Sequence, residues 1–541
     1  MRPTAPTGSA VVKFGGPART GAFVVMSAEG AMVVSRRRVL WGGAQALALA
    51  SAGRMTAGVA QAVPVRHTPT WEGSLPASSW RSLERALSLG AGLYRPGNAN
   101  YQKLVLPDNR RYAAVRPAGI TACATEKDVR AALGWAADHG MPFAVRSGGH
   151  NYAGYSTTTG LLISLRRMRG VVPSGHRLVL GGGATNSDVY EAKAANLYFP
   201  GGRCPGVGVA GLTLGGGLGF NDRKWGLTCD RLVETRLVLA DGSLVRASAR
   251  ENADLFWACR GGAGGNFGIN TGFTFEAVDV SAQRATVFDL TFPVRQGVEV
   301  MAAVQEALAA DEHNALDVRI GFKNEGQGNG GTLWLLGQRL GGQDSLQRAL
   351  APVLSLRPKK AFVQERHFWD AQDYLMERPG TPAASASKSL VPDSHIGRPA
   401  VEDIIGWIED WQPGQRGNAG YVTLFAMGGS SAQPGNGETA YPHRRGTFVI
   451  DIGSHWHTDT PRQTVDGLLA QLRTMHRTLR RGLETSAAYV NFPDPDLHDW
   501  QHAYYGANYE RLTDVKHHYD PTGLFRYGQS IGVADTATAH P

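Results

Sequence analysis

Several features that identify large classes of protein are missing from this sequence. It has no uninterrupted apolar run of about 18 or more residues, so no membrane span is expected. It has only four cysteines, too few for a disulfide scaffold, and no C-x-x-C pair, so a zinc ribbon is not expected either. A chain of 541 residues is too long for one hydrophobic core, which predicts two or three domains.

A large positive charge is also missing from most of the chain. The net charge is +9, but seven Lys or Arg against one acid give residues 1–62 a charge of +6, which leaves +3 for the rest. This nearly neutral body gives no electrostatic reason to expect nucleic acid as a partner.

Two pairs of histidines could each bind a metal ion. His455 and His457 would share one face of a strand, and His498 and His502 stand at helical i,i+4 spacing. Neither pair has an evident third ligand, so no metal site is expected.

A twin-arginine export signal is indicated by residues 1–62. Residues 35–40 read S-R-R-R-V-L, residues 40–52 form a short, weakly apolar run, and residues 60–62 read A-Q-A, a typical cleavage site. A start at Met26 or Met32 would give a signal of conventional length. The alternative is a disordered basic tail. Export in the folded state suits an extracellular enzyme that takes up its cofactor in the cytoplasm.

Hydrophobic periodicity predicts strands and helices along the whole body of the chain. Thr125 with an acid three residues later, Asp128, marks the start of a helix. Up to residue 280 we expect helices at 80–89 (capped by Ser78 or Ser79), 125–139 and 186–195, strands at 141–146, 161–165 and 178–180, and a hairpin at 231–245 turning at Asp241-Gly242. Beyond it we expect strands at 287–292 and 332–336, helices at 298–310, 345–353, 400–411 and 462–480, and a Ser- and Ala-rich loop at 381–391.

The segment 146–160, R-S-G-G-H-N-Y-A-G-Y-S-T-T-T-G, follows the strand at 141–146 directly. Paired glycines let the backbone approach a ligand closely and present N–H groups to anionic oxygens. His150, at the end of the glycine pair, can donate, accept or form a covalent bond. The segment is therefore a candidate loop for a cofactor phosphate; the alternative is a surface turn with a solvated histidine.

Two further glycine-rich blocks occupy residues 201–219 and 260–269. Gly206, Gly208 and Gly211 match the G-x-G-x-x-G fingerprint of dinucleotide-binding folds as a bare pattern. That fingerprint must open a helix, and four more glycines follow within eight residues. We therefore reject a Rossmann interpretation and expect an extended loop that wraps a cofactor.

Five separated motifs occur in an order that resembles a known family. They are R-S-G-G-H, G-R-C-P-G-V-G-V-A-G running on to L-G-G-G-L-G, the A-D-G hairpin, D-L-F-W-A-C-R-G-G-A-G-G-N-F-G, and the tail from Y-Y-G-A-N-Y-E-R-L to Q-S-I. Together, over residues 113–531, they resemble the berberine-bridge-enzyme-like FAD-linked oxidases of the vanillyl-alcohol-oxidase type, in the subgroup with bicovalent flavin.

The resemblance implies an α+β fold with defined parts. After the signal (1–62), residues 63–280 would form a two-subdomain FAD-binding domain of the PCMH type. Residues 281–490 would form a substrate domain, an antiparallel sheet covered by helices, and residues 491–541 would return to the FAD domain.

The resemblance also implies which residues hold FAD. His150 matches the histidine bonded to the flavin 8α carbon and Cys204 the cysteine bonded to C6, since a thiolate is a competent nucleophile once its pKa is lowered. The alternative for Cys204 is a buried free thiol. The further matches are Arg146, Ser147, Gly148, Gly149 and Tyr152 in the pyrophosphate loop, then Gly208, Gly211, Gly215, Gly216, Gly268 and Ile269, with Tyr527 and Gln529 in the returning tail.

The resemblance implies a small-molecule substrate and oxygen as the electron acceptor. Val207 matches a position where valine accompanies oxidases and larger residues accompany dehydrogenases; the alternative is that Val207 only packs. We expect an oxidase acting on a sugar hemiacetal or oligosaccharide, or on a hydroxylated secondary metabolite, and producing hydrogen peroxide. The alternatives are a flavoprotein dehydrogenase and a flavin-binding protein whose redox site has decayed.

The catalytic base is where this sequence departs from the family pattern. The three positions that are polar in many relatives are Leu218, Ile450 and Phe492 here. A base must take the proton of the substrate hydroxyl. We favour Tyr489, with Asn491 beside it, and keep Asp451 and Tyr421 as alternatives.

Overall fold

The computed structural model describes residues 23–27, 30–34, 71–328, 330–378 and 380–532. The chain divides into two compact units, residues 1–59 and 60–541. In the first, β1 (Phe23–Ser27) and β2 (Gly30–Val34) pair as an antiparallel hairpin. The twin-arginine motif, the apolar run and the cleavage site predicted within residues 35–62 lie outside the described residues.

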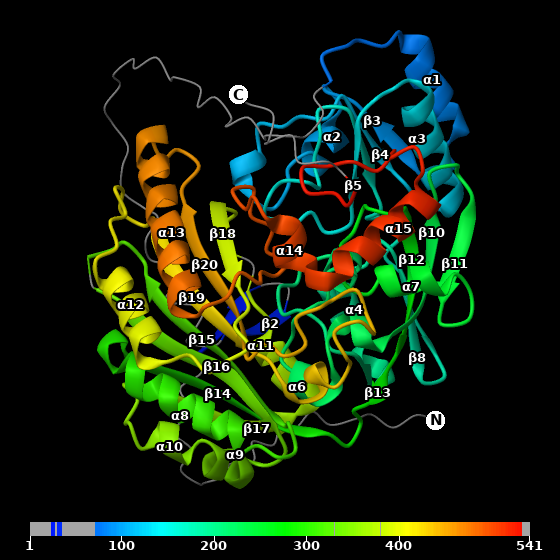
Figure 1. Ribbon diagram of the computed structural model, residues 1–541. Helices are drawn as coiled ribbons and strands as arrows, with labels where there is room; N and C mark the ends of the chain where they lie inside the picture. Colours follow the sequence, from blue (N-terminus) through cyan, green and yellow to red (C-terminus); the bar gives the residue numbers. More distant parts are fainter. Residues whose placement is uncertain (1–22, 28–29, 35–70, 329, 379, 533–541) are drawn as a thin grey trace, which may run out of the picture. The chain divides into compact units, whose positions relative to one another are not determined.

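Two sheets stand side by side in the first half of the second unit (Figure 1). One has the order β3 (Gly92–Tyr94), β4 (Gly119–Ala122), β6 (Leu161–Ser164), β5 (Phe143–Arg146), with parallel pairs joining the last three. The other is antiparallel, in the order β11 (Leu244–Ser248), β10 (Leu232–Val238), β12 (Ile269–Glu276), β8 (Arg177–Gly181), β7 (Val171–Ser174). A two-stranded ribbon joins β9 (Leu197–Tyr198) to β13 (Val278–Asp279). The segment 146–160 connects β5 to β6, at the carboxyl end of a parallel strand.

Helices of this half follow local sequence signals in several places. In α3 (Glu126–Asp138) Thr125 and Asp128 form the predicted capping box. The Asp241-Gly242 turn joins β10 to β11 as expected, with the Ser243 N–H donating to Asp241 Oδ1 at 2.8 Å. The other helices are α1 (Ala77–Ala86), α2 (Ala99–Leu104), α4 (Asn186–Glu191), α5 (Val209–Leu214), α6 (Asp222–Trp225) and α7 (Ala253–Ala258).

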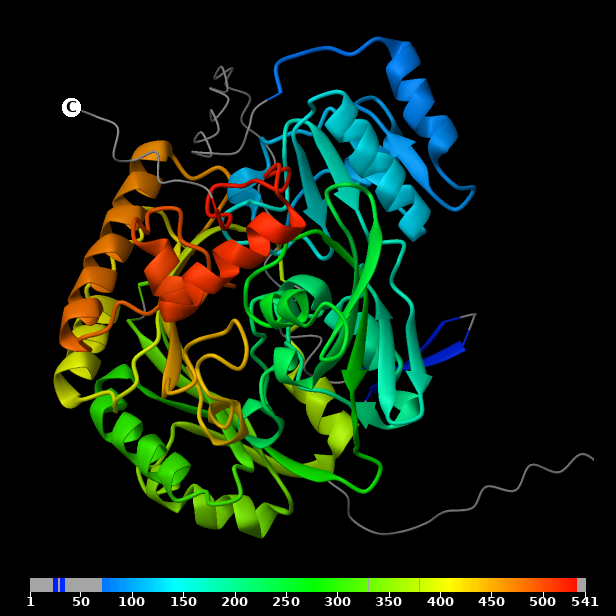
Figure 2. The same cartoon turned by 45° about the vertical axis from the view of Figure 1, so that its right-hand side comes forward.

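The larger sheet has seven antiparallel strands. Its order is β17 (Lys360–His367), β14 (Arg284–Pro293), β16 (Thr332–Leu340), β15 (Leu316–Asn324), β19 (Ala419–Ala426), β20 (Phe448–Trp456), β18 (Ala384–Leu390). Its helices are α8 (Gly297–Ala309), α9 (Gln343–Ala349), α10 (Ala351–Leu354), α11 (Phe368–Leu375), α12 (Arg398–Glu409) and α13 (Arg462–Gly482). α8, α12 and α13 cover its outer face, as Figure 2 shows from a second side. Helices on antiparallel sheets are the α+β class that the sequence predicts.

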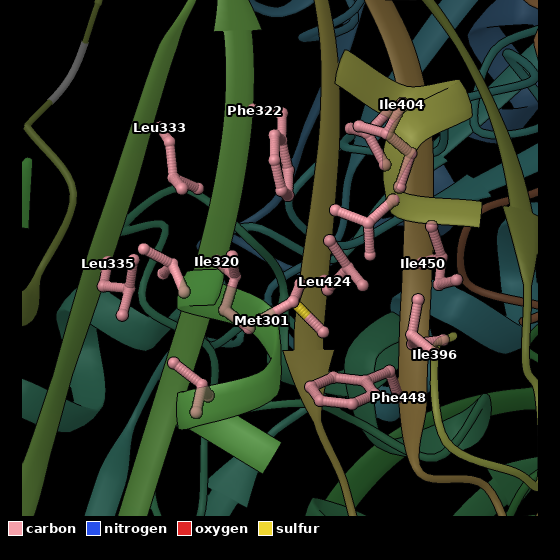
Figure 3. Close-up of a cluster of buried hydrophobic side chains, with 14 of the residues drawn as sticks. Met301, Ile320, Phe322, Leu333, Leu335, Ile396, Ile404, Leu424, Phe448 and Ile450 are labelled. Carbon is pink, nitrogen blue, oxygen red and sulfur yellow. The ribbon is translucent and has the colours of Figure 1, made fainter. Parts of the chain in front are cut away.

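The two faces of this sheet differ because side chains alternate along each strand. Even-numbered residues of β15, β19 and β20 point toward the helices and form the largest core, which includes Ile320, Leu424 and Ile450 (Figure 3). Odd-numbered residues, such as Arg319, Tyr421 and Asp451, occupy the opposite face. One face of the sheet therefore packs in the hydrophobic core, and the other face is available to line a functional site.

The C-terminal segment packs back onto the first two sheets. After α14 (Trp500–Tyr505) and α15 (Tyr509–Tyr519), Phe525 enters the core of the β3-β4-β6-β5 sheet. Lys516 fixes this return, since its Nζ donates to the carbonyl oxygen of Phe525 at 2.8 Å and to Asp520 Oδ2 at 2.6 Å. No helix in the described part of the chain is long and apolar enough to cross a membrane.

Three sequence predictions about elements are wrong. Residues 209–214 are not an extended loop but helix α5, because burial of Val209, Ala210 and Leu214 outweighs the low helix propensity of the glycines. Residues 384–390, expected in a loop, form the edge strand β18, whose Ala384, Ala386 and Leu390 fill the helix-covered core. Helix α1 starts after Pro76, earlier than the expected serine cap.

Candidate functional site

A cavity of about 380 Å³ lies where the three glycine-rich segments, the odd-numbered face of the large sheet and the C-terminal segment meet. It brings together most of the residues predicted from sequence. Those that line it are Ser147, Gly148, Gly149, His150, Tyr152, Cys204, Val207, Gly208, Gly211, Gly268, Ile269, Tyr489, Asn491, Tyr527 and Gln529.

The cavity floor requires glycine because two backbones touch there. A Cβ on Gly148 would stand 2.3 Å from the carbonyl oxygen of Gly206 and from the amide nitrogen of Gly208. At Gly211, in contrast, a Cβ would have no neighbour within 4 Å, so this side of α5 is open to the cavity. The glycines thus serve both close backbone packing and ligand access.

Three buried hydroxyl groups on the wall have no hydrogen-bond partner among the described residues. They are Ser147 Oγ, Ser156 Oγ and Thr157 Oγ1, all on residues that line the cavity. Buried polar groups are nearly always satisfied in native proteins, so this wall is built for a polar ligand. Unpaired hydroxyls over a glycine floor fit a phosphate-bearing cofactor such as FAD.

His150 is held by a carboxylate that sequence analysis did not identify. Its Nδ1 lies 3.3 Å from Asp108 Oδ2, and its side chain is 18% exposed. Burial lowers the pKa of His150, and Asp108 opposes this shift. Nε2 is close to the Cys204 loop, since a Cβ on Gly206 would stand 2.7 Å from it. A neutral ring with one nitrogen fixed by Asp108 suits a nucleophile.

Cys204 differs from the other three cysteines because it is only half-buried and reaches the cavity. Burial and the Glu377 carboxylate raise the pKa of its thiol to about 11, although the N–H groups of Gly206 and Val207 oppose this shift. The lowered pKa that would activate a thiolate is therefore not found.

Three predicted residues do not line the cavity. Arg146 turns away, and its Nε and Nη1 donate to the carbonyl oxygens of Ser156 at 2.8 Å and Leu104 at 2.7 Å. Gly215 and Gly216 pack beneath the wall, where a Cβ on Gly215 would stand 2.2 Å from Asn491 Oδ1. Their role is to hold neighbouring segments in place.

The side chain of Tyr152 does not belong to the wall of unpaired hydroxyl groups. It lies next to residues of the large sheet and of the segment that holds Phe492. Its ring stacks on Phe492, with centroids 5.4 Å apart and planes 2° from parallel. Phe492 in turn lies 5.6 Å from Phe425 and 5.0 Å from Tyr489. Phe492 and Leu218, two of the positions that are polar in relatives, thus give the cavity an aromatic and aliphatic side.

Tyr489 reaches the cavity with its hydroxyl already engaged. The oxygen accepts from the Gly217 N–H at 2.9 Å and from Asn491 Nδ2 at 3.1 Å. Asn491 Nδ2 also donates to the carbonyl oxygen of Leu212 at 2.9 Å. Burial raises the pKa of Tyr489, while the two donors oppose this shift because they favour the charged phenolate.

The register of β20 explains why Ile450 carries no polar group. Ile450 points into the helix-covered core, where Figure 3 shows it, and Asp451 occupies the cavity-side face. Asp451 bonds to the hydroxyls of Ser387 and Tyr421, and neither Asp451 nor Tyr421 lines the cavity itself. Burial raises the pKa of Asp451 to about 7. A buried carboxyl group therefore stands behind Tyr152.

The buried Asp451 predicts a specific dependence of stability on pH. Its pKa is higher in the folded protein than in the unfolded chain, so its contribution is most favourable below about pH 4 and is lost as pH rises to about 7. We expect Asp451→Asn to gain stability relative to the native protein over this range, by at most about 4 kcal/mol. Urea unfolding at several pH values measures the difference.

The matched control is Asp459→Asn, in the exposed turn after β20, for which the difference should stay flat with pH. A flat difference for Asp451→Asn as well would contradict the raised pKa.

The histidine pairs do not assemble a metal site. The ring of His455 lies against that of Tyr421, with centroids 5.0 Å apart and planes tilted by 41°, and His457 lies beyond the end of β20. His498 precedes α14, so the helical spacing expected with His502 is wrong. Among the described residues no group of three or more His, Cys, Asp or Glu side chains could hold a metal ion.

Sequence reasoning missed several polar residues of the site. Arg203, Arg319 and Glu377 line the cavity, and Asp108 contacts His150. For Arg319 a signal existed, because charged residues at 317, 319 and 323 alternate with apolar ones along β15. The other three stand in loops without a recognisable pattern.

Comparisons with known proteins agree with this site. The sequence model of the family described as "FAD binding domain" matches residues 117–248, and that described as "Berberine and berberine like" matches residues 488–532. An uncharacterized FAD-linked oxidoreductase, YgaK of Bacillus subtilis (strain 168), is 31% identical over 76% of this chain and 90% of its own. A xylooligosaccharide oxidase of Thermothelomyces thermophilus is 32% identical over 77% of this chain and 88% of its own.

The fold comparison gives the same result. The crystal structure of a carbohydrate oxidase from Microdochium nivale, in complex with a substrate analogue, superposes with a TM-score of 0.73 at 26% identity, over 84% of this chain and 99% of that one. The predicted α+β fold with a PCMH-type FAD-binding domain is confirmed. With its glycine-floored cavity, its two family matches and these relatives, the chain belongs to the berberine-bridge-enzyme-like family of FAD-linked oxidoreductases.

Proposed function

We propose that this FAD-linked oxidoreductase is an exported oxidase that removes hydride from the carbon of a sugar hemiacetal or another alcohol and reduces oxygen to hydrogen peroxide. The observation that carries the proposal is one cavity with two unlike sides: a glycine floor with unpaired hydroxyls, and the odd-numbered face of the large sheet, which contributes Arg319 and Phe425. FAD, when bound, supplies the hydride acceptor and passes the two electrons to oxygen. Relatives named as xylooligosaccharide and carbohydrate oxidases support a sugar-like alcohol.

One set of residues would hold FAD, and another would accept the proton of the substrate. Ser147, Ser156 and Thr157 would hold its phosphates, and His150 and Cys204 would bond to its ring, since both line the cavity. Because the pKa of the Cys204 thiol is raised, the bond to His150 would form more readily. Val207, also on the wall, would leave room for oxygen.

Tyr489 is the proposed acceptor of the proton of the substrate hydroxyl. It reaches the cavity, and two N–H donors face its oxygen and would stabilise the phenolate. Asn491 positions it from a fixed place on the carbonyl oxygen of Leu212. Tyr421 and Asp451 are set back from the cavity and would act on the substrate only through Tyr152.

The division of the chain completes the proposal. Residues 1–62 would direct export and be removed, residues 63–280 and 491–541 would hold FAD, and residues 281–490 would bind the substrate.

Peroxide release tests the function. The flavin-loaded protein, produced from residue 63 onward, is expected to release hydrogen peroxide with at least one member of a panel of mono- and oligosaccharides and phenolic alcohols. Anaerobic mixing with the same panel supplies the control, since it reads flavin reduction without oxygen. Flavin that is reduced by substrate but not reoxidised by air would favour a dehydrogenase, and flavin that no substrate reduces would favour a decayed site.

A further inference from the structure

Arg319 is a buried cation on the substrate side of the cavity. It stands on the odd face of β15, opposite Phe425 of β19, and is 6% exposed. Its guanidinium lies 4.3 Å from the ring centroid of Phe220 and 4.7 Å from that of Phe425. Burial lowers the pKa of Arg319 to about 10, so the group remains charged at neutral pH. The two rings hold the cation in place by cation–π contact.

The guanidinium of Arg319 has no polar partner. Within the described chain it makes no hydrogen bond and no ion pair, and its Nε is fully buried. Other buried arginines of this protein do have polar partners. Arg223 donates to the carbonyl oxygens of Leu316, Met427 and Leu308 at 2.7–3.0 Å, and Arg444 pairs with Asp230 at 2.6 Å. A buried charge without such partners is costly, and two aromatic rings offset that cost only in part.

Asp317, Asp222 and Glu377 attract this cation electrostatically, but none of them forms a hydrogen bond or ion pair with it. Asp317, on the same strand, accepts from the backbone N–H groups of Asp222 and Arg223, and burial raises its pKa to about 7. Glu377 lines the cavity but is exposed and pairs with neither arginine of the wall. The second arginine, Arg203 beside Cys204, also has a buried Nε that finds no hydrogen-bond partner among the described residues. Two cations and one exposed carboxylate, that of Glu377, thus face one space, and in the described part of the chain neither cation pairs with this carboxylate.

We propose that the substrate is an alcohol that carries a carboxylate, such as a sugar acid, and that Arg319, assisted by Arg203, binds this carboxylate. The inference rests on the proposed function, because it names the substrate class of the same cavity. A guanidinium presents a planar fork that matches a carboxylate with two parallel hydrogen bonds. Arg319 lies beyond Phe425, in the row of rings that continues through Phe492 to Tyr152.

Binding of matched sugars tests the proposal without requiring turnover. The probes are D-glucuronate, neutral D-glucose, the methyl ester of D-glucuronic acid and D-glucose 6-phosphate, titrated calorimetrically into the flavin-loaded protein. We expect D-glucuronate to bind at least tenfold more tightly than glucose or the ester, and Arg319→Gln to remove this preference. Arg319→Lys, which keeps the charge but not the fork, should restore part of it. Tighter binding of the phosphate than of the carboxylate would overturn the choice of anion.

Two controls separate the possible failures. Arg398→Gln, on the exposed face of α12, removes a surface arginine and should leave the preference intact. The flavin content and melting temperature of each variant show whether Arg319 instead holds FAD or the fold, and flavin loss in both Arg319 variants would overturn the proposal. Equal affinity for glucuronate and glucose in the native protein would overturn it as well. Absence of peroxide with every probe, with the glucuronate preference present, would count against the proposed oxidase function alone.

Discussion

Replacing Tyr489 by phenylalanine is expected to lower the rate of alcohol oxidation about a hundred- to ten-thousandfold, the usual contribution of a general base. The ring would remain and only the oxygen that Gly217 and Asn491 face would be lost. Flavin reduction by substrate, followed anaerobically in a stopped-flow instrument, measures the step directly. The bound flavin should keep its absorbance spectrum, since Tyr489 would not hold the cofactor.

Tyr441 offers a matched control for this substitution. It is another buried tyrosine, with its ring 6.1 Å from that of Tyr489, but it does not line the cavity, and its hydroxyl has no hydrogen-bond partner in the described part of the chain. Tyr441→Phe should therefore leave the rate of flavin reduction unchanged. An equal loss in both variants would assign the effect to packing, and a normal rate in Tyr489→Phe would move the role of base to Tyr152 with Asp451 behind it.

The double substitution of His150 and Cys204 by alanine is expected to abolish covalent attachment of the flavin completely. Acid-precipitated native protein should stay yellow, and each single variant should retain colour because the other bond remains. Since His150 is fixed by Asp108 while the pKa of the Cys204 thiol is raised, His150→Ala should retain less covalent flavin than Cys204→Ala.

Cys123→Ala is the control, because Cys123 is buried away from the cavity and both attachment residues remain. Mass spectrometry of the intact chains counts the attached flavin in each protein. If all the flavin leaves the native protein on denaturation, the bicovalent proposal is wrong and the two residues only contact the cofactor.

The sequence predicted the fold correctly where the structure of a segment depends mainly on its own residues. The capping box of α3 and the Asp-Gly turn between β10 and β11 are examples. The prediction was wrong where the structure of a segment depends on contacts with residues far away in the sequence. Ser and Ala at 384–390 have little strand propensity, and only pairing with β20 and burial against the helices make them β18. Burial likewise turned the glycine-containing residues 209–214 into α5.

The same distinction applies to the site. Glycine motifs identified the floor and the two candidate attachment residues, because such motifs lie within one continuous segment. Arg319 and Asp451 belong to different strands, and their place on the same face of the large sheet follows from the register that pairs β15 and β20 with β19. Asp108 reached His150 from a loop about forty residues earlier, a contact that no local spacing encodes.

The alternation on the large sheet has a consequence for changing this protein by laboratory evolution. Every second side chain of β15, β19 and β20 belongs to the helix-covered core, so random mutation of whole strands would mostly produce chains that do not fold. A library restricted to the intervening positions would vary selectivity while leaving the foldable scaffold untouched. Those positions are 317, 319 and 323, 421, 423 and 425, and 451 and 455. Positions 321 and 453 are left as glycine, because a Cβ there would stand 2.0 Å from the Trp334 ring and 2.1 Å from the Tyr421 ring.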